Sequence, residues 1–250
     1  EGLRRNVKFQ IANGISGLVP LGTTGESPTI TAEERAEVIR AVVSEAAGKV
    51  PVIVGTGTNS TAKTVHATEE AEELGADAAL VVSPYYNKPT QEGLYRHFKA
   101  VAESVEIPII VYNIQGRTAV NIETATLKRL AAEVKNIVAV KEASGNLAQM
   151  MDVVNDLPKD FVVLSGDDNL TLPLMAVGGK GVISVVSNLV PRKVSDMCSA
   201  ALKGDFATAR RIHYELMPLF KAAFIETNPI PIKAAMHMAG LAAGPVRLPL

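Results

Sequence analysis

The sequence predicts an α/β protein, a TIM (β/α)8 barrel followed by a helical region. Three observations support this prediction. Short apolar runs rich in Val, Ile and Leu recur along the chain, helical patterns separate them, and the strand-plus-helix unit repeats about every 25–30 residues. The runs are continuously apolar rather than alternating, as in parallel strands that are buried on both faces. A chain of 250 residues suits a single domain of this kind.

Seven apolar runs are the predicted strands. They span residues 14–22, 51–57, 78–86, 107–113, 137–143, 161–168 and 181–188. The helix predicted after the first run begins at Thr31, which can form a capping box with Glu34, and ends near Gly48. The next helix, TAKTVHATEEAEELGA, ends at Gly75.

An eighth strand is expected before the first helical pattern, LRRNVKFQIANG, because seven strands do not complete a barrel of eight. We therefore expect this chain to lack the first strand of the barrel and a tail beyond Leu250. The barrel is predicted to occupy residues 1–203, and a C-terminal helical region residues 204–250. An open, doubly wound sheet is the alternative, but GTGTNS at residues 55–60 is an incomplete G-x-G-x-x-G and supports it weakly.

Composition argues against several classes of partner. The net charge is −1, only 4% of residues are aromatic and there is no basic block, which argues against nucleic acid or an anionic membrane. The longest uncharged run, residues 9–25, is broken by glycines and an asparagine and is not expected to span a membrane. The single cysteine, Cys198, suits a reducing, cytoplasmic compartment. The four histidines are far apart in sequence, so no metal is expected.

Polar residues gather where the predicted strands end. They are Thr23, Thr24, Gly25, Glu26, Tyr85, Tyr86, Asn87, Tyr112, Asn113, Lys141, Glu142, Gly166, Asp167 and Asp168. In a TIM barrel the chemistry takes place at the C-terminal ends of the strands. We therefore expect these side chains to line one mouth.

Lys141 stands out because it directly follows the apolar run IVAV. Side chains alternate along a strand, so an inward Lys141 implies that Ile137, Ala139 and Ala143 also point inward and that Glu142 faces the helices. Burial disfavours the ammonium form of an inward lysine, which lowers its pKa and lets it form a Schiff base with a carbonyl. A strand-end lysine can also simply reach water, but the polar cluster favours the reactive interpretation.

Tyr112 ends the neighbouring strand, roughly 4.8 Å away, and its phenol can reach the same carbonyl. A phenol with a pKa of about 10 is a poor proton carrier alone, so hydroxyls from Thr23 and Tyr86 are expected to complete a relay. Each residue also has a plain structural interpretation. Tyr112 could be a packed aromatic, Thr23 a turn former, Tyr86 an interface residue and Arg117 a surface cation.

Seven motifs occur in order from one end of the chain to the other. They are GTTGESPT (22–29), SPYYNKPTQEGLYRHF (83–98), YNIQGRT (112–118), KEASGN (141–146), SGDD (165–168), GGKGVISV (178–185) and NPIPIK (228–233). The set resembles the dihydrodipicolinate synthase family, whose members are also called 4-hydroxy-tetrahydrodipicolinate synthases. Seven motifs in register are far more specific than any one of them.

The resemblance implies a Schiff-base lyase of lysine and diaminopimelate biosynthesis. Such an enzyme condenses pyruvate with L-aspartate 4-semialdehyde and needs no cofactor beyond the covalent lysine imine. By motif, Lys141 forms the imine and Tyr112 donates and accepts protons. Thr23 and Tyr86 complete the proton relay, with Tyr86 lent across a dimer interface.

The resemblance also assigns the binding residues. Thr24 and the backbone of Ile183 match pyruvate-binding positions, Gly166 lies in the loop lining the pocket, and Arg117 matches the position that holds the semialdehyde carboxylate. An arginine fork suits a carboxylate. Family members are usually homotetramers built as dimers of dimers, and the same assembly is expected here.

Two departures from the family pattern are visible. Members usually read YN-x-P-x-R, whereas Ile114-Gln115 stands here, which frees a backbone N–H and is expected to loosen the turn that aims Arg117. In members that lysine inhibits, the inhibitor binds in an interface cleft near Ser27, Asn59 and Tyr85. The histidines and the glutamate that assist there correspond to Ala32, Arg35 and Lys63 in this chain. Two cations there would repel an ammonium group, so weak or no inhibition by lysine is predicted.

Other functions remain open at this point. N-acetylneuraminate lyases and 2-keto-3-deoxy-sugar-acid aldolases share the lysine and the tyrosine, but GTTGES, NPIPIK and Arg117 favour the synthase. A catalytically silent barrel is a third possibility. Loss of the reactive residues would be expected in such a protein, yet Lys141, Tyr112, Thr23 and Tyr86 are all present.

Overall fold

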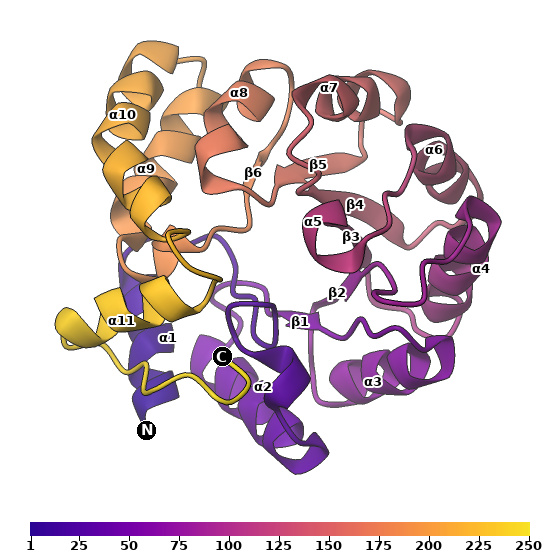
Figure 1. Ribbon diagram of the computed structural model, residues 1–250, viewed down its shortest axis with the longest axis horizontal. Coiled ribbons are helices and arrows are strands. Elements are labelled where there is room, and N and C mark those ends of the chain that lie inside the picture. The colour runs from indigo at the N-terminus through magenta and orange to yellow at the C-terminus, as the bar shows by residue number, and fades with distance from the viewer.

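A parallel sheet of six strands is the centre of the computed structural model, which describes residues 1–250. The strands are β1 (Ile53–Gly55), β2 (Ala78–Val82), β3 (Ile109–Asn113), β4 (Ile137–Glu142), β5 (Val162–Ser165) and β6 (Gly181–Val182). Each pairs with the next in sequence order, and the sheet curves into a half-barrel with helices around its outside (Figure 1). This consecutive order differs from a doubly wound sheet, in which the strand order reverses.

Helices connect the strands and continue beyond the last one. They are α1 (Gly2–Ala12), α2 (Ala32–Ala46), α3 (Thr61–Glu73), α4 (Gln91–Ala102), α5 (Gln115–Thr118), α6 (Thr124–Glu133), α7 (Leu147–Asp156), α8 (Thr171–Ala176), α9 (Pro191–Leu202), α10 (Phe206–Ala222) and α11 (Ile230–Met238). The predicted capping box of α2 is present: the Glu34 N–H donates to Thr31 Oγ1 at 3.3 Å, and the Thr31 N–H donates to Glu34 Oε2 at 3.0 Å. No helix combines the length and the apolar character needed to cross a membrane.

Six of the seven predicted strands form, and the remaining one, residues 14–22, makes only a single parallel bridge between Leu18 and Val52. The Leu18 N–H donates to Pro51 O at 2.9 Å, and the Gly55 N–H donates to Pro20 O at 3.0 Å. Pro20 has no N–H to give, which helps to explain why a regular strand does not develop. This segment therefore lies along β1 and ends the sheet on that side, while β6 ends it on the other.

The two faces of the sheet carry different side chains. The outer face packs on the helices in a large cluster that includes Val81, Val111 and Val140, and the inner face carries Leu80, Ile110, Tyr112, Ala139 and Ala143.

The prediction that Ile137 points inward is wrong, because Ile137 belongs to the outer cluster. The register slips between β3 and β4: Ile109 pairs with Ile137, but Ile110 pairs with Ala139. Val138 is the extra residue, and the alternation holds only from Ala139 onward.

The C-terminal helices pack against the wall of the half-barrel. Met175 of α8, Val194 of α9, Ile212 of α10 and Ile232 of α11 belong to one hydrophobic cluster. In Figure 1, α9 and α10 stand beside α8, and α11 passes in front of α1 in this view. This packing brings residues 228–233 to the mouth of the half-barrel, next to residues 22–26.

Candidate active site

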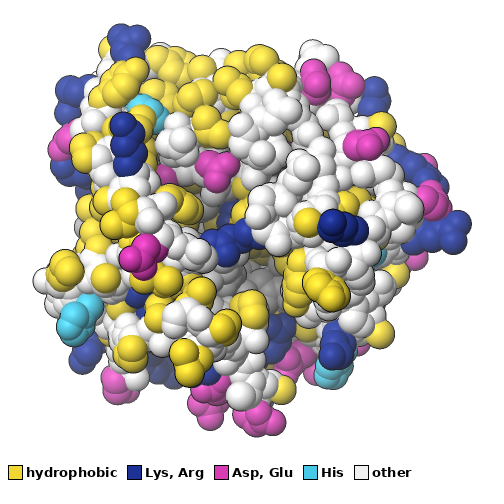
Figure 2. All heavy atoms as spheres, viewed as in Figure 1, with side chains coloured by type: hydrophobic (Ala, Val, Ile, Leu, Met, Phe, Trp, Pro, Cys, Tyr) yellow, Lys and Arg dark blue, Asp and Glu magenta, His cyan; other side chains and the backbone are white.

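A cavity of roughly 610 Å³ opens among the strand ends. Figure 2 shows it as a hollow near the centre of the molecule, with dark blue Lys or Arg atoms inside. Seven of the eight residues predicted for the site line this cavity: Thr23, Thr24, Tyr112, Arg117, Lys141, Gly166 and Ile183. Tyr86 does not, because its side chain is on the surface and 88% exposed. The structure thus gathers the predicted site within one chain, apart from Tyr86.

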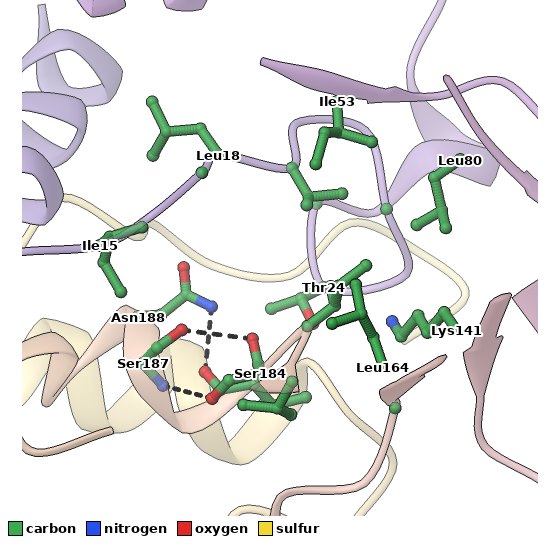
Figure 3. A pocket seen from close by; sticks show the side chains of 18 of the residues that line it. Ile15, Leu18, Thr24, Ile53, Leu80, Lys141, Leu164, Ser184, Ser187 and Asn188 are labelled. Atoms are coloured by element: carbon green, nitrogen blue, oxygen red, sulfur yellow. Dashed lines mark hydrogen bonds between the residues drawn. The ribbon is translucent and has the colours of Figure 1, made fainter. Parts of the chain in front are cut away.

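Lys141 is buried near the end of β4 and points into the cavity, toward Thr24 and between Leu80 and Leu164 (Figure 3). Its Nζ atom lies 4.1 Å from the ring centroid of Tyr112. Burial lowers the pKa of Lys141 to about 8, while the negative charges of Asp167 and Asp168 act in the opposite direction. A substantial fraction of the amine is therefore neutral in mildly alkaline solution.

Glu142 points to the other side of the sheet and does not pair with Lys141. It is fully buried, and its carboxylate accepts hydrogen bonds from Asn113 Nδ2 at 3.1 Å and from the Ser144 N–H at 2.8 Å. The alternation argument predicts this divergence, because both residues lie beyond the register slip. Lys141 consequently has no carboxylate bonded to it within its own strand.

Tyr112 lies one residue before the end of β3, directly beside Lys141, its paired residue on β4. Burial raises the pKa of Tyr112 to about 12, although a hydrogen bond with Thr23 and the charge of Arg117 act in the opposite direction. The phenol therefore stays protonated at neutral pH. It is placed to donate a proton to a group held near Lys141 Nζ.

Gly166 and Ile183 shape the wall around the lysine. A Cβ atom at Gly166 would lie 2.5 Å from Ala143 Cβ and 3.1 Å from Lys141 Cε, so only glycine fits there. The Ile183 N–H donates to Ser165 O at 2.9 Å. That N–H is therefore occupied within the protein.

Arg117 lies in α5, the short helix that follows β3. Three hydrogen bonds to Ile114 O close this turn: from the Arg117 N–H at 3.1 Å, the Thr118 N–H at 3.0 Å and Thr118 Oγ1 at 2.9 Å. The turn is therefore closed in the absence of proline, and the expected loosening stays a prediction. Gln115 occupies the first helical position, where a backbone N–H needs no partner within the helix, so the turn closes without proline.

Asn228 is a residue of this site that the sequence analysis did not identify. It is buried, its Nδ2 donates to Thr24 Oγ1 at 3.0 Å, and its carbonyl oxygen accepts from Arg117 Nη2 at 3.0 Å. One residue thus connects the expected pyruvate-binding and carboxylate-binding side chains. The sequence feature that could have identified Asn228 is its position as the polar first residue of the NPIPIK motif.

Asp167 and Asp168 lie at the end of a predicted strand, and the sequence suggests no role for either carboxylate. Asp168 is buried and accepts hydrogen bonds from the Val185 and Val186 N–H groups at 2.9 and 3.2 Å, which ties the end of β5 to the loop after β6. Asp167 lines the cavity, and burial raises its pKa. Both place negative charge near Lys141.

The cavity continues away from Lys141 between residues 15–21 and β6. Ile15, Leu18, Ser184, Ser187 and Asn188 line this extension (Figure 3). No group of three or more His, Cys, Asp or Glu side chains lies close enough together to hold a metal ion.

Comparison with known proteins agrees with this geometry. The model of the dihydrodipicolinate synthetase family matches residues 1–250. The 4-hydroxy-tetrahydrodipicolinate synthase of Methanocaldococcus jannaschii is 55% identical over 250 residues, which make up 100% of this chain and 86% of the relative. The crystal structure of dihydrodipicolinate synthase from Aquifex aeolicus has a TM-score of 0.98 and 55% identity, covering 100% of this chain and 85% of that one.

A further solved structure, described as the first monomeric dihydrodipicolinate synthase variant, also has a TM-score of 0.98, with 46% identity over 100% of this chain and 84% of that one. Family match, identity and fold agree over the whole length of the chain. The chain therefore belongs to the dihydrodipicolinate synthetase family.

Proposed function

We propose that this protein is a lyase that condenses pyruvate with L-aspartate 4-semialdehyde to give 4-hydroxy-tetrahydrodipicolinate. The observation that carries the proposal is the buried amine of Lys141, whose pKa burial lowers to about 8, held beside the protonated phenol of Tyr112. The curated relatives of the same name, 55% identical over the full chain, support the reaction. No cofactor is needed, because the lysine itself activates the first substrate.

The reaction begins when neutral Lys141 Nζ attacks the keto carbon of pyruvate. The carbinolamine loses water to give a protonated imine, with Tyr112 in position to protonate the departing oxygen. Loss of a proton from the methyl carbon gives an enamine, and this carbon bonds to the aldehyde carbon of the semialdehyde. The substrate amine then displaces Lys141 from the imine, which closes the ring and restores the free lysine.

We assign the binding roles from the positions of the lining residues. Thr24, Gly166 and Ile183 would bind pyruvate next to Lys141, and all three line the same cavity as the lysine, which supports the assignment. Arg117 lies at the mouth on α5 and offers a guanidinium for the carboxylate of the second substrate. Thr23, hydrogen bonded to Tyr112, would be the first member of the proton relay.

The relay would be completed by Tyr86 from a second copy of the chain. The side chain of Tyr86 is 88% exposed, outside the cavity of its own chain, and its backbone φ of 74° holds it in an unfavoured conformation. A homotetramer built as a dimer of dimers would bring it to a neighbouring mouth. Because one of the similar structures is described as a monomeric variant, the oligomeric state of this protein should be measured.

We further propose that the half-barrel is part of a TIM barrel of eight strands. The support is an unpaired edge on each side of the opening, formed by residues 15–21 and by β6, with the apolar extension of the cavity between them. One additional parallel strand would satisfy both edges. Residues 1–203 would then form the barrel and residues 204–250 its C-terminal helical region. A cytoplasmic location stays a prediction.

Borohydride trapping tests the function directly. The protein is incubated with pyruvate and sodium borohydride, and the reduced adduct is located by mass spectrometry of the digested chain. We expect the modification on Lys141 alone, and its absence would overturn the Schiff-base mechanism. Turnover with aspartate semialdehyde, compared with sugar aldehydes, then separates the synthase from the related keto-acid aldolases.

A further inference from the structure

The loop of residues 21–26 carries Thr23 and Thr24 into the active site, and its backbone is unusual at both ends. Leu21 has φ 59° and Glu26 has φ 54°, so two residues with side chains adopt the left-handed conformation that favours glycine. Such conformations persist where surrounding contacts hold them. The loop therefore depends on its neighbours to keep its two threonines in place.

One end of the loop is fixed against the sheet. The Gly55 N–H of β1 donates to Pro20 O at 3.0 Å, and a Cβ atom at position 55 would lie only 2.1 Å from Leu21 O. Backbone packs on backbone here without room for a side chain. The position of Leu21 is thus set by β1.

The other end of the loop is held by a partly buried ion pair. Lys233 Nζ of α11 donates to Glu26 Oε2, and the two side chains are only 13% and 11% exposed. Glu26 Oε1 also accepts the Arg247 N–H at 2.8 Å, and Lys233 Nζ donates to Pro245 O at 2.7 Å. The carboxylate of Glu26 has both oxygens occupied, by partners more than 200 residues away in sequence.

The segment that supplies Lys233 contacts the same loop at a second point. Asn228, five residues before Lys233, donates to Thr24 Oγ1 and accepts from Arg117. Residues 228–233 therefore bind the loop at Thr24 and at Glu26. A shift of this segment would move the threonines relative to Lys141.

We propose that the Glu26–Lys233 ion pair is a positioning device for the active site, which holds the loop so that Thr23 and Thr24 meet Tyr112 and pyruvate. Neither side chain lines the cavity, so the pair acts through the loop and not on the substrate. The inference rests on the proposed function, because it concerns how fast Lys141 forms its imine with pyruvate.

The test measures the rate of the borohydride-trapped pyruvate adduct in four single variants and in the double variant Glu26→Gln/Lys233→Met. Glu26→Gln keeps the side-chain shape and an acceptor for the Arg247 N–H, and Lys233→Met keeps most of the volume, so each removes one charge. Lys233→Arg keeps the charge. Glu215→Gln is the matched control, because it removes one partner of an exposed ion pair, Lys193–Glu215, on α9 and α10.

We expect Glu26→Gln and Lys233→Met each to slow adduct formation by about 10-fold or more, since small displacements of groups that orient a substrate have effects of this size. The double variant is expected to be no slower than either single variant, because both act through one ion pair. Lys233→Arg and Glu215→Gln should retain the rate of the unmodified protein.

Three results would overturn the inference: unchanged adduct rates in Glu26→Gln and Lys233→Met, additive losses in the double variant, or losses that occur only at temperatures where circular dichroism shows unfolding. Absence of an adduct in the unmodified protein is a separate outcome. It would overturn the proposed function itself and the positioning role with it.

Discussion

Replacing Lys141 by methionine is expected to stabilise the protein while abolishing its reaction with pyruvate. Burial lowers the pKa of Lys141 from 10.5 to about 8, so the folded protein disfavours the charged form that predominates at pH 7. Lowering the pKa over this range corresponds to about 3 kcal/mol of folding free energy, at about 1.4 kcal/mol per tenfold change in proton affinity. Methionine fills a similar volume without a charge, and its free energy of unfolding should be higher by up to about this amount.

The direction of the pKa shift of Lys141 determines how the stability advantage of Lys141→Met depends on pH. Between the folded pKa of about 8 and the unfolded value of 10.5, the unfolded chain binds more protons at Lys141 than the folded chain does. The stability of the unmodified protein therefore gains a contribution as pH rises through this window, and loses it as pH falls through the folded pKa. The advantage of Lys141→Met should be full at pH 7 and shrink toward pH 10.

Urea denaturation at pH 7 and at pH 10 measures both quantities. Lys128→Met is the matched control, because the side chain of Lys128 is 60% exposed and its charge stays in water. We expect no comparable gain in that variant. A Lys141→Met variant that is less stable than the unmodified protein at pH 7, or whose stability advantage does not depend on pH, would contradict this prediction.

Three further predictions concern pyruvate adduct formation and inhibition by lysine. Gly166→Ala places a Cβ atom 2.5 Å from Ala143 Cβ, which requires a shift of about 1 Å and should slow pyruvate adduct formation by about 100-fold; Gly116→Ala, with nothing within 4 Å, should not. Adduct formation should speed up with pH and level off above about 8, where Lys141 loses its proton, and a flat profile in stopped-flow trapping would contradict this pKa. Free L-lysine should inhibit turnover weakly or not at all because of Arg35 and Lys63, and half-inhibition at submillimolar lysine would disprove it.

Most of the fold and the site could be predicted because they depend on local patterns. Continuous apolar runs locate β1 to β6, and seven of the fourteen strand-end residues expected at the mouth line the cavity. The inward direction of Lys141 follows from alternation along a single strand, counted over the few residues from Ala139 to Ala143. These features require no knowledge of which distant residues meet.

The features that escaped prediction depend on contacts between distant parts of the chain. The register slip that turns Ile137 outward arises from the pairing of β3 with β4, and the residues IVAV do not indicate it by themselves. Asn228 reaches Thr24 across 204 positions, and Lys233 reaches Glu26 across 207. A sequence motif can mark such residues as unusual, but only the folded chain pairs them.

The charges around Lys141 show why its pKa is lowered only to about 8. Burial opposes the ammonium, and Arg117 adds to that effect, but Asp167 and Asp168 favour a positive charge at the same place. The protonated imine that follows from attack on pyruvate also carries its positive charge there. A site that strongly disfavoured positive charge would keep the amine of Lys141 neutral but would destabilise the protonated imine. Two carboxylates without burial would instead keep the lysine protonated and unreactive. The balance of burial and charge permits a neutral nucleophile and a cationic intermediate at one nitrogen, and this is what a Schiff-base lyase requires of its lysine.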